Sequence, residues 1–149
     1  MSPTHVLVPL DGSPLADEAL SEALDLFECR ITVLNVVTPL DRGMSEGGVL
    51  DAGDERREGA RERADRLVER ARGRAADADR TVETVVRTGD PAETILAFVE
   101  ERDVDRVVMG GHGGPEAGAL RRLLGTVSTA VVGKAPVPVT VVREVGETA

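Results

Sequence analysis

Short apolar runs rich in β-branched residues alternate with longer segments of helical periodicity, and this alternation restricts the possible folds more than any other feature. The runs that predict strands are "HVLVPL" (5–10), "ITVLNVV" (31–37), "TVETVVR" (81–87), "VDRVVMG" (104–110) and "VPVTVV" (137–142). Such alternation is typical of a parallel sheet covered by helices on both faces, and nearly continuous apolar strands agree with that burial. We therefore expect an α/β fold with an open, doubly wound five-stranded sheet.

Helices are predicted in the intervals between these runs. The first follows Ser13, a suitable N-cap, and begins with Pro14, which is favourable in a first helical turn. A second helix is expected over residues 54–78, where an apolar stripe runs through a charge-rich segment. A third opens with the capping box "DPAE" at 90–93, and a fourth begins near Thr126 and stops before the next proline.

The length of 149 residues predicts a single domain over 1–149. Within it, we expect residues 38–53 to form a flexible loop and residues 143–149 a tail. No apolar run approaches the ~18 residues of a membrane span, and no signal peptide opens the chain. With a single cysteine, Cys29, the chain has no internal disulfide, and a cytoplasmic location without membrane association is expected.

The charge balance is acidic. There are 18 Lys and Arg residues against 27 Asp and Glu, a net charge of −9, which repels nucleic-acid phosphates and anionic lipids. The chain also has no Trp or Tyr on which bases would stack. We therefore expect no nucleic-acid partner. Lys134 is the only lysine, as in halophile-like acidic proteins, although a GC-rich genome also favours arginine.

Two loops with unusual chemistry follow predicted strands. "PLDGS", containing Asp11, follows the first strand, and "GGHGG" (110–114) follows the fourth. In an open parallel sheet, ligands bind beyond the carboxyl ends of the strands, where the winding direction reverses. If both loops belong to one site, strands one and four are neighbours, and the predicted strand order is 3-2-1-4-5.

The chemistry of these loops favours a nucleotide. Glycine lets backbone N–H groups approach an anion closely, and the helix start at "GTVSTAV" adds unpaired amides and the hydroxyls of Thr126 and Ser128. The Asp11 carboxylate would accept hydrogen bonds from ribose hydroxyls or an exocyclic amine, or hold a metal ion. Together, the phosphate-binding glycines and this carboxylate match the parts of a nucleotide.

Taken singly, these features have simpler interpretations. The glycines also suit a tight turn, Asp11 also suits capping of the first helix, and His112 alone is interpreted as a loop histidine. No second histidine or cysteine lies nearby in the sequence to support a zinc site. A Walker A loop is excluded because Ala135 stands where Ser or Thr is required, and Glu116 breaks the Rossmann glycine spacing.

The chain resembles the universal stress protein family from end to end. The resemblance rests on "VLVPLDGSPLADEAL", "ITVLNVV", "RTGDPAETILAFVEERDVDRVVMGGHG" and "LRRLLGTVSTAVVGKAPVPVTVV", in that order. It implies a five-stranded α/β fold of strand order 3-2-1-4-5 and a homodimer formed through the fifth strands. Residues 137–142 suit that role, because Pro138 cannot donate to a ladder and predicts an edge strand.

One branch of this family binds ATP through the pattern Gly-x2-Gly-x9-Gly-Ser/Thr. Gly110 and Gly113 match its first part, and Gly125 with Thr126 matches its last, but eleven residues rather than nine separate the two parts. The resemblance implies that residues 9–11 flank the adenine and ribose, that the Val36 backbone contacts the adenine edge, and that residues 125–128 hold phosphates. The residues expected to bind the nucleotide are Pro9, Leu10, Asp11, Val36, Met109, Gly110, Gly111, His112, Gly113, Gly125, Thr126, Val127 and Ser128.

The ligand implied by the resemblance is ATP, or the related AMP or ADP, with or without Mg²⁺. Asn35, where the family often has histidine, is expected to affect packing beneath the site more than ligand contact. No catalytic or metal-binding residue is predicted, so we expect slow hydrolysis at most. The leading alternative is a dimeric interaction module that binds no nucleotide. A receiver-like phosphoacceptor using Asp11 is disfavoured, because the only lysine is Lys134.

Overall fold

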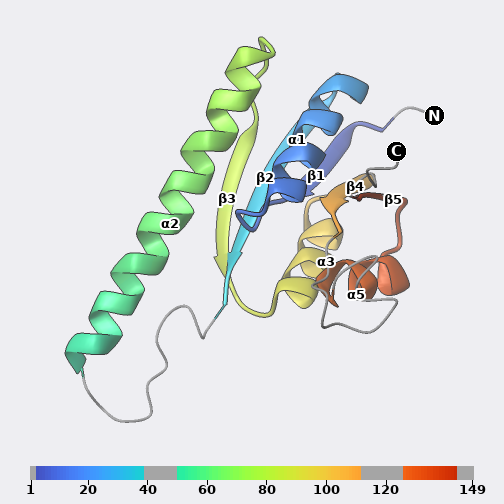
Figure 1. Ribbon diagram of the computed structural model, residues 1–149. Helices are drawn as coiled ribbons and strands as arrows, with labels where there is room; N and C mark the ends of the chain where they lie inside the picture. Colours follow the sequence, from blue (N-terminus) through green and yellow to red (C-terminus); the bar gives the residue numbers. More distant parts are fainter. Residues whose placement is uncertain (1–2, 39–49, 112–125, 144–149) are drawn as a thin grey trace, which may run out of the picture.

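A five-stranded parallel sheet forms the centre of the computed structural model (Figure 1). The structure describes residues 3–38, 50–111 and 126–143, with side chains from residue 58 onward in the second range. The elements are β1 (His5–Pro9), α1 (Pro14–Leu26), β2 (Arg30–Val37), α2 (Leu50–Asp77), β3 (Glu83–Thr88), α3 (Pro91–Glu101), β4 (Arg106–Gly110), α5 (Thr126–Lys134) and β5 (Val139–Val142). The strand order β3-β2-β1-β4-β5, with every pair parallel, confirms the predicted topology.

The starts of α1 and α3 follow the local signals in the sequence. The Ser13 hydroxyl accepts a hydrogen bond from the Ala16 amide at 3.2 Å, and Pro14 is the first residue of α1. The Asp90 carboxylate accepts from the Glu93 amide at 3.0 Å, and proline again follows the cap. Both caps satisfy an amide that has no partner within its helix, and both predicted helix starts are confirmed.

Helix α2 is longer than the sequence pattern predicts. It begins at Leu50 rather than 54, so the end of the predicted 38–53 loop is helical, and Gly53 lies inside the helix. A glycine within a helix costs only about 1 kcal/mol relative to alanine, which this 28-residue helix tolerates. Residues 39–49 of the predicted loop lie outside the described residues. Among the α2 side chains that the structure describes, the buried ones are Ala60, Ala64, Ala71 and Ala75.

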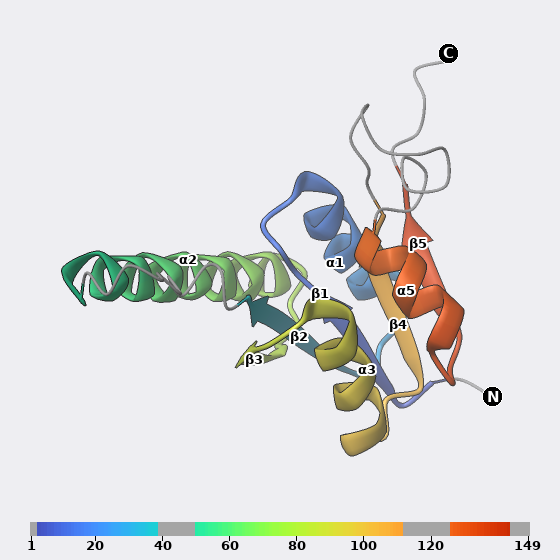
Figure 2. The same cartoon turned by 90° about the horizontal axis from the view of Figure 1, so that it is seen from below.

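Two helical layers cover the sheet (Figure 2). Helices α1 and α2 pack on one face, over the alternate residues Val6 and Val8 of β1 and Ile31 and Val33 of β2. Helices α3 and α5 pack on the other face, whose core includes Phe98. β5 lies at the edge of the sheet, and Pro138 directly precedes it, as predicted from the inability of proline to donate.

Candidate functional site

The chain turns sharply where β1 ends. Pro9 is the last residue of β1, and Leu10 beyond it is buried. Asp11 is exposed, and its carboxylate accepts a hydrogen bond from the Ser13 amide at 2.9 Å. Between them, Gly12 adopts φ +88°, a left-handed conformation that side chains other than that of glycine rarely allow. The turn therefore presents a carboxylate at the carboxyl end of β1.

The end of β4 lies against the first turn of α1. A Cβ atom on Gly110 would lie 2.6 Å from the carbonyl carbon of Leu15 and 2.7 Å from the nitrogen of Ala16. These distances are too short for any side chain, so this glycine allows strand and helix to approach closely. Met109 before it is buried, and the Gly111 amide donates to the Val142 carbonyl of β5 at 2.9 Å.

Helix α5 is tied directly to the end of β4. Ser128 is buried, and its hydroxyl donates to the Gly110 carbonyl at 3.0 Å. Thr126, the first residue of α5, is exposed, and Val127 packs partly against the core. The first amides of a helix have no acceptor within it and attract negative charge. The Ser128 bond holds this end of α5 beside the glycine pair.

The structure brings the described parts of the predicted site to one edge of the sheet. β1 and β4 are parallel neighbours, so the Asp11 turn, Gly110–Gly111 and the start of α5 lie at their carboxyl ends. Val36 lies near the same end of the neighbouring strand β2 and is partly buried. The other predicted site residues, His112, Gly113 and Gly125, lie outside the described residues.

Asn35 supports the Asp11 turn from below. This β2 residue is 6% exposed, and its amide Nδ2 donates to the Leu10 carbonyl at 2.8 Å. The sequence predicts packing beneath the site at this position, but it does not reveal the hydrogen bond, which depends on the β1–β2 register. The left-handed conformation of Gly12 also shapes the Asp11 turn and is not predicted, although "DG" after a strand is a recognisable turn signal.

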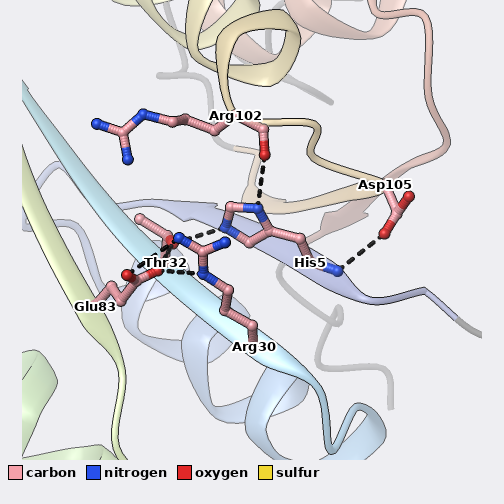
Figure 3. A network of polar contacts seen from close by, with 6 residues as sticks. All are labelled: His5, Arg30, Thr32, Glu83, Arg102 and Asp105. Atoms are coloured by element: carbon pink, nitrogen blue, oxygen red, sulfur yellow. Dashed lines mark hydrogen bonds and ion pairs between the residues drawn. The ribbon is translucent and has the colours of Figure 1, made fainter.

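A second polar cluster lies at the opposite, amino-terminal edge of the sheet (Figure 3). Nδ1 of the buried His5 lies 3.0 Å from the Arg102 carbonyl, which can only accept, so Nδ1 is the donor. His5 Nε2 lies 2.8 Å from the Thr32 hydroxyl, which in turn lies 3.0 Å from Glu83. The Thr32 hydroxyl donates to the Glu83 carboxylate, which can only accept. The cluster joins β1, β2, β3 and the end of α3.

Two carboxylates of this cluster are stabilised in their charged form. A hydrogen bond from the Arg30 guanidinium is the largest cause that lowers the pKa of Glu83 below its ordinary value. Hydrogen bonds from the Thr4 hydroxyl, the Thr4 amide and the His5 amide lower the pKa of Asp105. Both carboxylates lie beside the first residues of strands, far from the Asp11 turn.

None of the helices in the part of the chain that the structure describes is long and apolar enough to cross a membrane. No three His, Cys, Asp or Glu side chains of that part of the chain are grouped as metal ligands would be.

Comparison with known proteins identifies the family. The model of the universal stress protein family matches residues 3–143, nearly the whole chain. The chain belongs to the universal stress protein family. Universal stress protein YxiE from Bacillus subtilis is 29% identical over 146 residues, covering 93% of this chain and 97% of the relative. The family predicted from the sequence motifs is confirmed.

Solved structures of other universal stress proteins share the fold. UspA from Lactobacillus plantarum superimposes with a TM-score of 0.80 at 24% identity, covering 96% of this chain and 99% of that one. A universal stress protein in complex with cAMP gives 0.70 at 22% identity, covering 95% and 98%. A family member from Arabidopsis thaliana with AMP bound gives 0.69 at 21%, covering 97% and 94%.

Proposed function

We propose that this universal stress protein binds an adenine nucleotide at the carboxyl edge of its sheet and acts as a homodimeric stress-response regulator. The observation that carries the proposal is the convergence of the Asp11 carboxylate with Gly110–Gly111 and the start of α5 on neighbouring strands. Asp11 supplies an acceptor for sugar or base, and the first amides of α5 supply donors for phosphate, while Gly110 lets the end of β4 approach α1 closely. The ligand is AMP, ADP or ATP, with or without Mg²⁺.

Each part of the nucleotide has a proposed partner. The Asp11 carboxylate accepts from ribose hydroxyls, while Leu10 and the Val36 backbone flank the adenine. The amides at the start of α5 hold phosphate, where the positive end of the helix dipole favours negative charge. We include Gly113 and Gly125 in this phosphate-binding segment, because their spacing partly follows the family's ATP pattern.

The bound ligands of two fold neighbours support this class of ligand. One neighbour is in complex with cAMP and another has AMP bound. Both ligands combine an adenine, a ribose and one phosphate. The Asp11 turn would bind the ribose, and the first amides of α5 would bind the phosphate. ATP adds two phosphates, for which we propose the longer glycine segment after β4.

Calorimetric titration with AMP and with ATP tests the proposal. We expect Asp11→Ala to bind at least about tenfold more weakly, as for the loss of a charged hydrogen-bond acceptor. Asp90→Ala is the matched control, because it also removes a carboxylate that accepts an amide at a helix start, but beside the more distant β3. Gly113→Val and Gly125→Val are expected to abolish binding.

The alternative function is a dimeric interaction module that binds no nucleotide. The eleven-residue interval between Gly113 and Gly125, two longer than the family's ATP pattern, favours it. Mass spectrometry of the gently purified protein discriminates between the two, since a co-purified nucleotide supports the first. A wild-type protein that binds neither AMP nor ATP contradicts the proposed site. An Asp11→Ala protein that binds both nucleotides as tightly as wild type also contradicts it.

A further inference from the structure

Asn35 is a buried polar residue on an otherwise apolar face. It follows Ile31 and Val33 on the side of β2 that packs against α1 and α2, and it lies beside the buried Leu10. Burying an amide among apolar side chains costs free energy unless its polar atoms are hydrogen-bonded. Here the amide nitrogen is used on one specific backbone group, the Leu10 carbonyl at 2.8 Å.

That carbonyl is the last backbone acceptor before Asp11. The Leu10 amide still extends the β1–β2 ladder by donating to the Leu34 carbonyl at 2.8 Å. The Leu10 carbonyl accepts from the Asn35 side chain instead, at the point where the chain leaves the sheet. Asn35 thus holds the position at which β1 ends and its turn begins.

Holding this carbonyl also orients the next residue. The peptide bond between Leu10 and Asp11 is trans, as are all those described, and a peptide group is planar. The direction of the Leu10 carbonyl therefore sets the direction of the Asp11 amide and the path into Asp11. From the other side, the Ser13 amide donates to the Asp11 carboxylate. The turn is thus anchored at both ends.

We propose that Asn35 is a positioning residue for nucleotide binding, acting through the Leu10 carbonyl to place Asp11 without touching the ligand. The inference rests on the proposed function, because it concerns the same site. The Asn35 amide nitrogen donates to the Leu10 carbonyl, so its hydrogen bond acts on the residue directly before Asp11. The loss of this bond would let the Asp11 turn shift away from its binding position.

The test is calorimetric titration of AMP into wild type, Asn35→Leu and a control, with folding followed by urea denaturation. Asn35→Leu keeps a similar volume and removes the donor, and we expect about tenfold weaker AMP binding, the size expected for one lost hydrogen bond. Thr32→Val is the control, since Thr32 is also a buried polar residue of β2 but forms its hydrogen bonds at the opposite edge of the sheet. It should lose stability and keep its affinity for AMP.

A second variant, Asn35→Asp, separates positioning from packing. Burial favours the protonated form of the introduced acid, so AMP binding is measured across a pH series. Where the acid is ionised, its carboxylate faces the Leu10 carbonyl without a hydrogen to donate, so AMP binding should be weak. At lower pH the protonated acid can donate to that carbonyl, and affinity relative to wild type at the same pH should rise. If lost stability alone were the cause, AMP binding would be weakened in Asn35→Leu and in Thr32→Val alike.

Each outcome separates the two proposals. Wild type that binds no AMP or ATP contradicts the proposed function and, with it, this role of Asn35. Wild type that binds AMP while Asn35→Leu binds it equally well contradicts the positioning role alone. Equal loss of affinity in Asn35→Leu and Thr32→Val also overturns it, because binding would then follow stability rather than the Leu10 hydrogen bond.

Discussion

At the scale of single residues, two glycines differ sharply in what surrounds them. A Cβ on Gly110 would meet the backbone of α1 at 2.6 Å, whereas nothing lies within 4 Å of a Cβ on Gly73 in α2. We expect Gly110→Ala to destabilise the fold by about 1–3 kcal/mol, because a backbone cannot yield as a side chain does. Gly73→Ala should stabilise it by about 0.5–1 kcal/mol through higher helix propensity. Urea denaturation of both variants measures the contrast, and equal stabilities would contradict the close contact between β4 and α1.

Asp105 carries a prediction about pH. Three hydrogen bonds from Thr4 and His5 lower its pKa in the folded protein below the ordinary value of 3.8. A carboxylate with a lowered pKa contributes stability that is present above its ordinary pKa and lost as the pH falls through its folded-state value. Asp105→Asn should therefore be less stable at neutral pH, with a difference from wild type that shrinks below pH 3.8.

Urea midpoints at neutral pH and in steps below 3.8 measure this effect. The matched control is Glu100→Gln, which changes an exposed carboxylate on α3 in the same way. It should show little difference from wild type at any pH. An Asp105→Asn variant with the same acid dependence as wild type would mean that its hydrogen bonds do not stabilise the folded state.

At the scale of elements, the start of α3 is held by one side chain. The Asp90 carboxylate accepts from the Glu93 amide at 3.0 Å, and Pro91 follows it in the first turn. Replacing an N-cap aspartate by alanine costs about 1 kcal/mol, so Asp90→Ala should lower the free energy of unfolding by that amount. Asp90→Ser keeps a capping oxygen and should remain near wild type. If both variants unfold alike, the cap is not what stabilises α3.

The same element shows which features a sequence can predict. The caps at Ser13 and Asp90 lie within three residues of the amides they bond, so local spacing identifies them. The sequence directly before α2, Gly48-Val49, carries no such capping pattern, and the helix begins four residues before the predicted boundary. The His5 cluster could not be predicted, because the partners of His5 lie up to 100 residues away in the sequence and meet it only in the folded sheet.

At the scale of the whole molecule, the placement of the candidate site followed from topology. Two loops with complementary chemistry predicted that β1 and β4 are neighbours, and the sheet order confirms this. The reason for Gly110 was missed, since a close approach of α1 is a tertiary contact that a glycine-rich sequence does not specify. The Asn35 bond to Leu10 was missed for the same reason, although the position of Asn35 beneath the site was expected.

The proposed homodimer leads to a prediction about the edge strand. The carbonyls of Pro138 and Val142 accept from the β4 side, from the amides of Val107 and Gly111. Because backbone groups alternate along a strand, those of Val139 and Val141 point to the free edge. Val141→Pro removes an outward amide without breaking a bond to β4, so it should convert a dimer paired through β5 into monomers.

Size-exclusion chromatography with light scattering measures the outcome. Val141→Ala is the control, since it trims the same side chain but keeps the outward amide, and it should remain dimeric. A wild-type protein that is monomeric contradicts the homodimer itself, whereas a Val141→Pro protein that stays dimeric places the interface elsewhere. The proposed site lies at the carboxyl ends of β1 and β4, and β5 extends the sheet on the β4 side. AMP affinity of the Val141→Pro monomer therefore decides whether each subunit binds nucleotide alone or needs its partner, and we expect it to bind alone.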